Sequence, residues 1–298
     1  MIFDIHNSDL GKSTEYQLNY DASLLFRIPR AENREKYAID SAASPFVGYD
    51  VWNCYELSFL TSNGLPVVCL LKMVVSSHSE YIVESKSLKL YLFSLNMKRF
   101  ESTINASLQK AQQLIKADLE ALLETEVQIS LLHDSDKEKS IFVSHDQLQL
   151  SSLIDDQVLA TIEFDHFKEA PDLLIGSKCE RSQLLQFKCD LLRSNCRVTN
   201  QPDWGELFVT IESNFKIDLV QMLAYIVSFR EENHFHEEVV EMIYKRLWDT
   251  FSPSKLMVAA TYTRRGGIDI NPIRASESSL MDAALINPST RIKKSFRQ

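Results

Sequence analysis

A cysteine and an aspartate seven positions apart are the residues of this sequence best suited to covalent chemistry. Cys196 ends a predicted strand in SNCRVTNQPDWG (194–205), and a turn that contains Pro202 follows it. This turn can fold Asp203 back toward the thiol, so that a thiolate nucleophile lies beside a carboxyl group able to donate a proton. Such a pair suits an electrophile that becomes basic when it is attacked. The spacing also fits, and more often reflects, an inert cysteine at a strand end and an aspartate that caps backbone amides.

Two acidic residues at predicted helix starts could recognise a flat heterocycle. Glu237 follows Phe235 and His236 at one helix start, and Glu84 opens another helix in ESKSLK. A carboxylate can accept two neighbouring N–H donors, as on the edge of guanine, while an aromatic ring stacks beside it. The helix macrodipole also favours an acid in the first turn without any ligand, so both interpretations stay open.

The histidines beside Glu237 do not predict a metal site. His234 and His236 are two positions apart, so they do not share a helix face. No third ligand stands near them in the sequence, and we therefore expect no bound metal.

Several cations could hold a phosphorylated cofactor. Lys86 and Lys89 follow Glu84, and Arg264-Arg265-Gly266-Gly267 forms a predicted hairpin turn. Arginine forks match phosphate oxygens, although solvated charges on a turn are the common case. The seven glycines of the chain form neither G-x-G-x-x-G nor G-x-x-x-x-G-K-[ST], which excludes the usual Rossmann and P-loop fingerprints.

Composition narrows the functional class. The 298 residues carry a formal net charge of −9, which argues against partners such as nucleic acids or anionic membranes. No apolar run approaches the roughly 18 residues of a membrane span. The N-terminal segment MIFDIHNSDLGKST has early acids and no long apolar core, so we expect no secretory signal.

The cysteines indicate a reducing, cytoplasmic setting. There are five of them and no C-x-x-C motif, which fits free thiols better than a disulfide framework. Cys54 and Cys69 lie inside apolar strand-like runs and are expected to be buried and inert. Cys179 is expected to lie in a charged loop.

The elements that must position these residues occur in the same order in both halves of the chain. Each half is predicted to run strand, strand, helix, helix, strand, with a further strand expected. In the first half these elements are expected in 51–76 (two strands around a turn at 62–64), 84–96, 102–122 (capped by Ser102 or Thr103) and 127–133. In the second half they are expected in 184–195, 206–213, 216–233, 234–251 and 255–272 (two strands around Gly266-Gly267).

This order predicts an α+β fold of two antiparallel units, each with two helices on one face of its sheet. The repeat is one of pattern and not of residue identity. The stretch 133–182, which contains the charged run DSDKEK, is expected to hold the last strand of the first unit and the connection to the second.

Four segments in order resemble the signature segments of the NADPH-dependent 7-cyano-7-deazaguanine reductases, the nitrile reductases of queuosine biosynthesis. These segments are ESKSLKLYLFSLN (84–96), SNCRVTNQPDWG (194–205), SFREENHFHE (228–237) and YTRRGGIDINP (262–272). The likeness extends from LGKSTEY and YDASLLF near the start and matches the long, two-domain form. It implies two tandem tunnelling-fold (T-fold) units: 1–165, with an N-terminal extension, and 166–298, with the catalytic cysteine.

The resemblance also implies the reaction and its residues. Two NADPH would reduce the nitrile to the amine of 7-aminomethyl-7-deazaguanine, and the enzyme would be a cytoplasmic homodimer that binds no nucleic acid and no membrane. Cys196 would form a covalent thioimide and Asp203 would donate the proton. The remaining roles carried over are substrate binding by Val83, Glu84, Ser85, Phe235, His236 and Glu237, and NADPH binding by Ser85, Lys86, Arg265 and Gly266.

Two other classes of protein remain alternatives. A different T-fold enzyme, such as an amidine-forming relative or a pterin-type cyclohydrolase, would differ in NADPH binding or in a zinc site. A heterocycle-binding protein that has lost activity would bind the base without turnover. The joint presence of Cys196, Asp203, Glu237 and the cationic residues argues against this last alternative.

Overall fold

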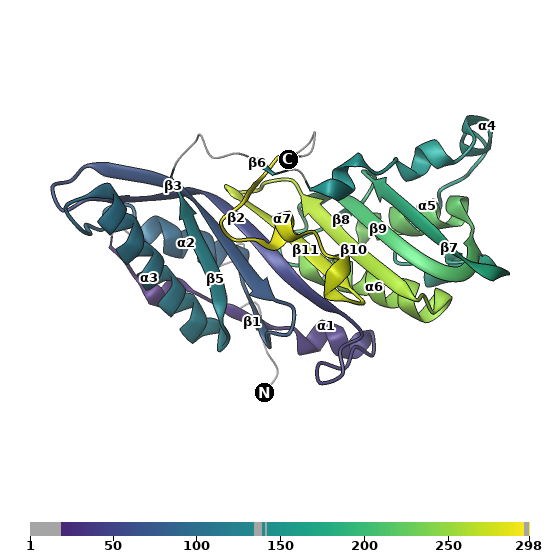
Figure 1. Cartoon of the computed structure of the whole chain (residues 1–298), viewed down its shortest axis with the longest axis horizontal. Coiled ribbons are helices and arrows are strands. Elements are labelled where there is room, and N and C mark those ends of the chain that lie inside the picture. Colours follow the sequence, from purple (N-terminus) through teal and green to yellow (C-terminus); the bar gives the residue numbers. More distant parts are fainter. Residues whose placement is uncertain (1–18, 134–138, 141, 295–297) are drawn as a thin grey trace.

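One antiparallel sheet, built by both halves of the chain, runs through the whole molecule (Figure 1). The computed structural model describes residues 19–133, 139, 140, 142–294 and 298. The strands of the main sheet in the described residues are β2 (Val47–Leu60), β3 (Pro66–Ser76), β5 (Val127–Leu132), β7 (Gly176–Cys189), β8 (Arg193–Asn195), β9 (Pro202–Ile217), β10 (Lys255–Tyr262) and β11 (Ile268–Ala275). Their order is β5-β3-β2-β11-β10-β9-β7, and β8 pairs beside β9.

The two halves meet at the pairing of β2 with β11. The antiparallel register runs without a break from Ile268 opposite Cys54 to Ala275 opposite Val47. We call this pairing the β2–β11 seam. Side chains along the seam come from both halves of the chain, so a site built there needs both.

The four longer helices cover one face of the sheet. They are α2 (Ser85–Ser94), α3 (Ile104–Leu123), α5 (Leu219–Ser228) and α6 (His236–Phe251). Ile270 packs in the hydrophobic cluster of α2 and α3, while Val258 packs in that of α5 and α6. Val258 is paired with Arg274, which lies on the same face of β11 as Ile270, and paired residues share a face. Both helix pairs therefore lie on one face of the sheet.

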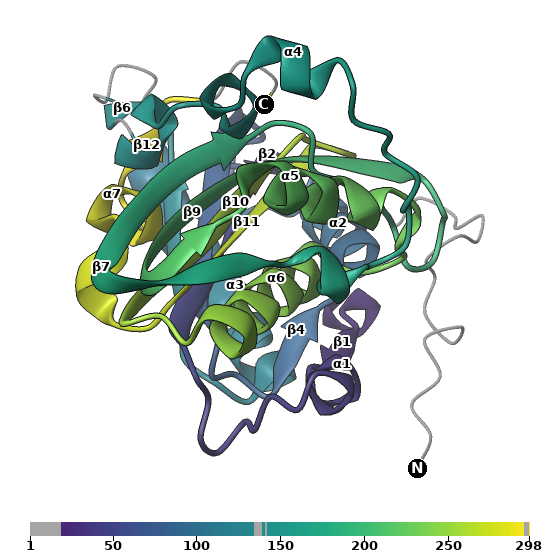
Figure 2. The ribbon, with the colours of Figure 1, turned by 90° about the vertical axis from the view of Figure 1, so that its right-hand side faces the viewer.

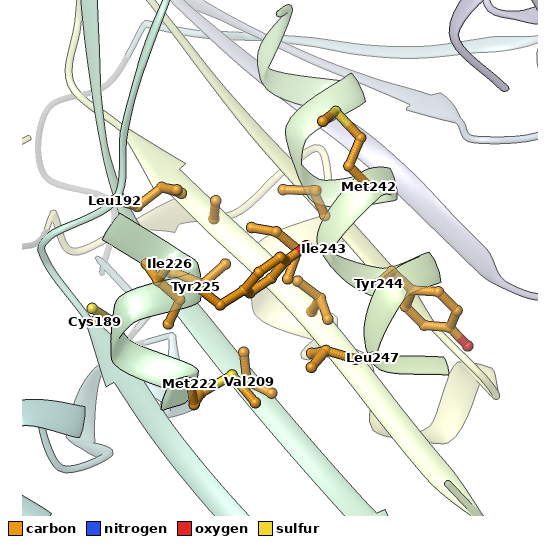
Figure 3. Packing of buried hydrophobic residues seen from close by; sticks show 14 of the residues in the cluster. Cys189, Leu192, Val209, Met222, Tyr225, Ile226, Met242, Ile243, Tyr244 and Leu247 are labelled. Carbon is orange, nitrogen blue, oxygen red and sulfur yellow. The ribbon is translucent and has the colours of Figure 1, made fainter. Parts of the chain in front are cut away.

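The hydrophobic core of the second half holds α6 against the sheet. Figure 3 shows Met222, Tyr225 and Ile226 of α5 meeting Ile243 and Leu247 of α6 over the sheet. Their spacing of three and four residues places these side chains on one stripe of each helix. Burial of each such side chain stabilises the fold by about 1.5–3 kcal/mol. The stripe holds α6 on the sheet, with its first turn at the β2–β11 seam.

Shorter elements complete the described chain. β1 pairs with β4, β6 pairs in parallel with β12, and residues around α7 pack on the second face of the sheet. The bounds are β1 (Arg27–Pro29), α1 (Ala31–Lys36), β4 (Tyr81–Val83), β6 (Lys139–Ser140), α4 (Asp156–Leu159), α7 (Ala283–Ile286) and β12 (Arg291–Ile292). No helix in the described part of the chain is long and apolar enough to cross a membrane.

The predicted α+β order is found in both halves, with four corrections. The strand expected in 184–195 is interrupted, because β7 ends at Cys189 and β8 begins only at Arg193. The last strand expected in 133–182 is only the two-residue β6, outside the main sheet, and most of DSDKEK lies outside the described residues. Cys179 lies in β7 and not in a loop, because β7 pairs with β9 on both sides of it, up to Lys178 and again from Gln183. The turn after Cys196 is shorter than expected, because β9 already begins at Pro202.

The edge strand β7 is long and irregular. Its register on β9 shifts between Lys178 and Gln183, and Figure 2 shows β7 as a strongly curved ribbon. A bulge at a sheet edge increases twist and discourages pairing with another chain. The predicted division at 165/166 precedes this strand and remains a prediction.

Candidate active site

A pocket opens at the β2–β11 seam, beside the first turn of α6 and the end of β4. It is lined by Trp52, Ile82, Val83, Ser85, Cys196, Asp203, His234, Phe235, His236, Glu237, Arg265 and Ile270. The structure thus brings together residues from both halves that the sequence analysis singled out separately. The predicted site residues Glu84, Lys86 and Gly266 do not line this pocket.

The hairpin of β8 and β9 positions the cysteine and the aspartate. Ser194 is paired with Asp203, and Cys196 follows the last residue of β8. The Cys196 amide donates to the Gln201 carbonyl at 2.8 Å, which closes the turn. The Cys196 side chain is buried and faces the same pocket as Asp203.

Asp203 lies between two side chains that can carry positive charge. Its Oδ2 is 3.4 Å from His236 Nε2, and its Oδ1 is 3.4 Å from an Arg265 terminal nitrogen. The His236 ring stacks on Tyr262, with centroids 3.8 Å apart and planes 4° from parallel. The stack fixes the orientation of the imidazole, so its Nε2 and the Asp203 carboxyl group face each other inside the pocket.

The first turn of α6 directs Glu237 into the pocket. Phe235 is the N-cap residue, and its amide donates to Glu238 Oε2 at 3.0 Å. Because Glu238 makes this capping bond, Glu237 is not needed for it. Glu237 is 3% exposed, and its Oε1 has no hydrogen-bond partner among the described residues.

Burial raises the pKa of Glu237 to about 8, and the negative charge of Asp50 acts in the same direction. The positive charges of Arg30 and Arg274 oppose this shift. Without a ligand the carboxyl group is therefore mostly protonated at neutral pH. A ligand with N–H donors would favour the ionised form.

His234, considered above only as a metal ligand, has a different role in the structure. Its two ring nitrogens lie 3.1 Å from Glu232 and 3.3 Å from Glu238. Arg197 bridges Glu238 and Glu32 at 3.0 and 3.2 Å. These pairs tie the turn after Cys196 to α6 and α1. No cluster of three or more metal-ligating groups occurs in the part of the chain that the structure describes.

Glu84 caps α2 beside the pocket. Its Oε1 accepts the Lys86 amide and its Oε2 accepts the Ser87 amide, both at 2.8 Å. Burial raises the pKa of this carboxyl group, although these hydrogen bonds oppose the shift. The cap fixes the chain so that Val83 and Ser85, on either side of Glu84, face the pocket.

The turn at 264–267 brings cations to the rim of the pocket. Arg265 lines the pocket, and Gly266 has a positive φ of +60°. A Cβ on Gly266 would lie 3.0 Å from Lys89 Nζ, so the turn passes close to α2. Lys89 therefore lies close to the turn that carries Arg265.

The apolar walls of the pocket were not predicted from the sequence. Trp52 and Ile270 are paired across the β2–β11 seam, and Ile82 adds a third apolar side chain from β4. Such residues suit the faces of a planar ring. Nothing local distinguishes them from other buried strand residues, because only the long-range pairing of β2 with β11 brings them together.

Two family models match the chain. "Nitrile reductase, 7-cyano-7-deazaguanine-reductase N-term" matches residues 16–131, and "QueF-like protein" matches residues 202–280. A curated protein of Polaromonas sp. named "NADPH-dependent 7-cyano-7-deazaguanine reductase" is 40% identical over 93% of this chain and 96% of its own length. Proteins with the same name from Burkholderia ambifaria and Acinetobacter baumannii are 41% and 38% identical, over 92% and 93% of this chain and 95% and 96% of their own length.

The chain belongs to the 7-cyano-7-deazaguanine reductase family. The resemblance drawn from four segments is confirmed, and the near-complete coverage of these relatives agrees with the long form. Of the two N-terminal segments that carried the likeness, YDASLLF is in the described chain and LGKSTEY lies outside the described residues. A solved structure titled archaeosine synthase QueF-Like in the apo form has a TM-score of 0.29 and 15% identity, and it covers 33% of this chain and 95% of its own. An overlap this weak bears on neither the fold nor the function of this reductase family member.

Proposed function

We propose that this protein reduces the nitrile of 7-cyano-7-deazaguanine to the amine of 7-aminomethyl-7-deazaguanine with NADPH, in queuosine biosynthesis. The observation that carries the proposal is that Cys196, Asp203 and Glu237 line one pocket. A nucleophile, an acid and an acceptor for heterocycle N–H groups are the three functions this reaction needs. The names of relatives that match almost the whole chain support the same activity and the same cofactor.

In the first step the Cys196 thiolate attacks the nitrile carbon. A carbon–sulfur bond forms, and one π bond of the nitrile gives its electron pair to nitrogen. Nitrogen takes a proton from Asp203, so the net change is addition of S–H across the C≡N bond to give a thioimide. His236, 3.4 Å from Asp203, can return a proton to the carboxylate.

The heterocycle would be held by Glu237 and the apolar walls. Glu237 would accept N–H groups of the guanine-like edge, with Phe235, His236, Val83 and Ser85 around the ring. Glu84 stays a predicted substrate contact. Its two oxygens accept α2 amides, so a direct contact would be shared with the helix cap.

The residues at the rim fit NADPH. Arg265 keeps 39% of its side chain exposed, and Lys89 lies close to Gly266, where a side chain would meet the Lys89 ammonium group. These cations, with Ser85 and Lys86 at the start of α2, would hold the phosphorylated cofactor. When bound, NADPH supplies the hydride for each of the two reductions. The chain itself holds the thioimide carbon in a pocket shielded from water and provides protons from Asp203 and His236.

The finer architecture is part of the proposal. The repeated helix pairs on one face, and family-model matches on either side of 165/166, support two tandem T-fold units. A cytoplasmic homodimer is proposed with them. Light scattering during size-exclusion chromatography should give twice the mass of one chain, and a single-chain mass would contradict the dimer.

Mass spectrometry tests the covalent step. Protein mixed with 7-cyano-7-deazaguanine and no NADPH should gain the mass of one substrate, and Cys196→Ala should gain nothing. With NADPH, two equivalents should be consumed for each substrate. An unmodified wild-type protein, or a fully active Cys196→Ala variant, would contradict the proposed mechanism.

A further inference from the structure

Five charged side chains lie buried together beneath the first turns of α6. Each is at most 6% exposed, and they come from α1 and its N-cap, β2, α6 and β11. We call them the buried ionic cluster: Arg30, Arg34, Asp50, Glu241 and Arg274. Burial on this scale is costly for a charge unless its partners compensate it.

The contacts within the cluster are dense. Arg274 lies 2.8 Å from Asp50 and 2.9 Å from Glu241, and Arg34 binds both oxygens of Glu241 at 2.7 and 2.9 Å. Arg30 contacts the second oxygen of Asp50 and the Ser79 hydroxyl. The arginines lower the pKa values of Asp50 and Glu241, so both carboxylates are ionised.

The cluster is not neutral by itself. Three guanidinium groups face two carboxylates, which leaves one positive charge in excess. Glu237, whose ionisation is influenced by Asp50, Arg30 and Arg274, is a candidate for the missing negative charge. It precedes Glu241 by four residues on α6, and residues at this spacing lie on the same helix face.

Titratable and charged groups surround Glu237 on two sides. The charges of Asp50, Arg30 and Arg274 influence its ionisation from the cluster side. On the pocket side stand Asp203, His236 and Tyr262. An unpaired Oε1 makes ionisation unfavourable until hydrogen-bond donors arrive.

We propose that the buried ionic cluster supplies the countercharge for Glu237, and that Arg30 and Arg274 act as positioning residues for heterocycle recognition. The inference rests on the proposed function. The N–H groups of the bound heterocycle supply the hydrogen bonds that the ionised carboxylate needs, and the cluster supplies its charge balance. Glu237 therefore loses a proton to the buffer when the heterocycle binds.

Calorimetric titration tests this proton release. Cys196→Ala protein, which cannot form the adduct, is titrated with 7-cyano-7-deazaguanine at pH 7 in phosphate and in Tris buffer. The difference in heat should correspond to release of close to one proton for each site. The same protein carrying Glu237→Gln should release none.

A double-mutant cycle separates charge balance from packing. In the Cys196→Ala protein, Arg30→Gln should raise the Kd for the heterocycle about tenfold or more. The free energy of interactions with a buried ionised group corresponds to a change of this size. Arg30→Lys, which keeps the charge, should recover part of the loss. When Glu237→Gln is already present, Arg30→Gln should change the Kd less than about twofold, because no charge remains to balance.

Arg246→Gln is the matched control. Arg246 pairs with Glu169 at 2.8 Å further along α6, so this variant should lower the Tm without changing Kd or proton release. Binding without proton release, or an equal loss from Arg30→Gln in both backgrounds, would overturn this inference alone. Absence of binding by the Cys196→Ala protein would overturn the proposed function and this inference together.

Discussion

At the scale of single residues, the proposed mechanism makes Asp203 the proton donor. Asp203→Asn keeps the size of the side chain but removes the carboxyl proton, so NADPH consumption should fall by ~10²-fold or more. The rate of NADPH oxidation with saturating 7-cyano-7-deazaguanine measures this. Binding of the heterocycle should persist, and turnover within about twofold of wild type would exclude Asp203 as the acid.

Glu237 makes a second residue-scale prediction, which concerns stability. Its pKa is raised to about 8 by burial, above the usual 4.5 that it has in the unfolded chain. Between these two values the folded protein holds a proton that the unfolded chain has lost, so stability falls as the pH rises. Glu237→Gln removes this dependence. Its Tm relative to wild type should therefore rise steadily from pH 5 to pH 8, and a constant difference would contradict the raised pKa.

At the scale of elements, the β8–β9 hairpin decides how the cysteine faces the aspartate. Asn200 closes the turn with a φ of +55°, a conformation that asparagine tolerates and β-branched residues do not. Asn200→Val should cost about 1–2 kcal/mol of unfolding free energy and lower the rate of adduct formation. Chemical denaturation measures the first effect and mass spectrometry the second. Asn200→Gly, which also tolerates this φ, should keep the unfolding free energy and the rate of adduct formation closer to wild type than Asn200→Val does.

Local signals predicted most of the elements but not all of their ends. Thr103 caps α3 as one of the two candidates proposed, and the polar segment around Glu84 starts α2 as expected. The prediction of a loop at Cys179 is wrong, because this edge strand carries polar residues and lacks the alternation of apolar and polar residues that indicates a strand. Only its partner β9 identifies that stretch as a strand.

At the scale of the whole molecule, the β2–β11 seam joins the halves and tolerates little added volume. A Cβ on Gly48 would lie 2.1 Å from the Ile273 carbonyl oxygen and 2.9 Å from Arg274 Cδ. Gly48→Ala should destabilise the fold by about 1–3 kcal/mol and weaken heterocycle binding, because it separates the strands beside the buried ionic cluster. Thermal melting and calorimetry measure this. Val68→Ala, at an exposed position on β3, is the control and should change neither.

The candidate site was predictable only in part, and the reason is topological. Cys196, Asp203 and Glu237 stand in recognisable segments of the sequence. Trp52 and Ile270 do not, because each becomes a pocket wall only when strands more than 200 residues apart pair with one another. The buried ionic cluster depends on the same pairing, and no sequence pattern links Arg30 to Glu241.

The β2–β11 seam can form only late in the synthesis of the chain. The edge of β2 that β11 later covers emerges from the ribosome early, whereas β11 is among the last strands to be made. A chain interrupted before Ile268 would therefore leave that edge open and Cys196 without a finished pocket. Pairing of two strands so far apart in the sequence is slow, and an unpaired strand edge favours aggregation until it is covered. Nascent chains of this protein are thus expected to need shielding until β11 has been translated, and Cys196 is enclosed in its pocket only after β11 has paired with β2.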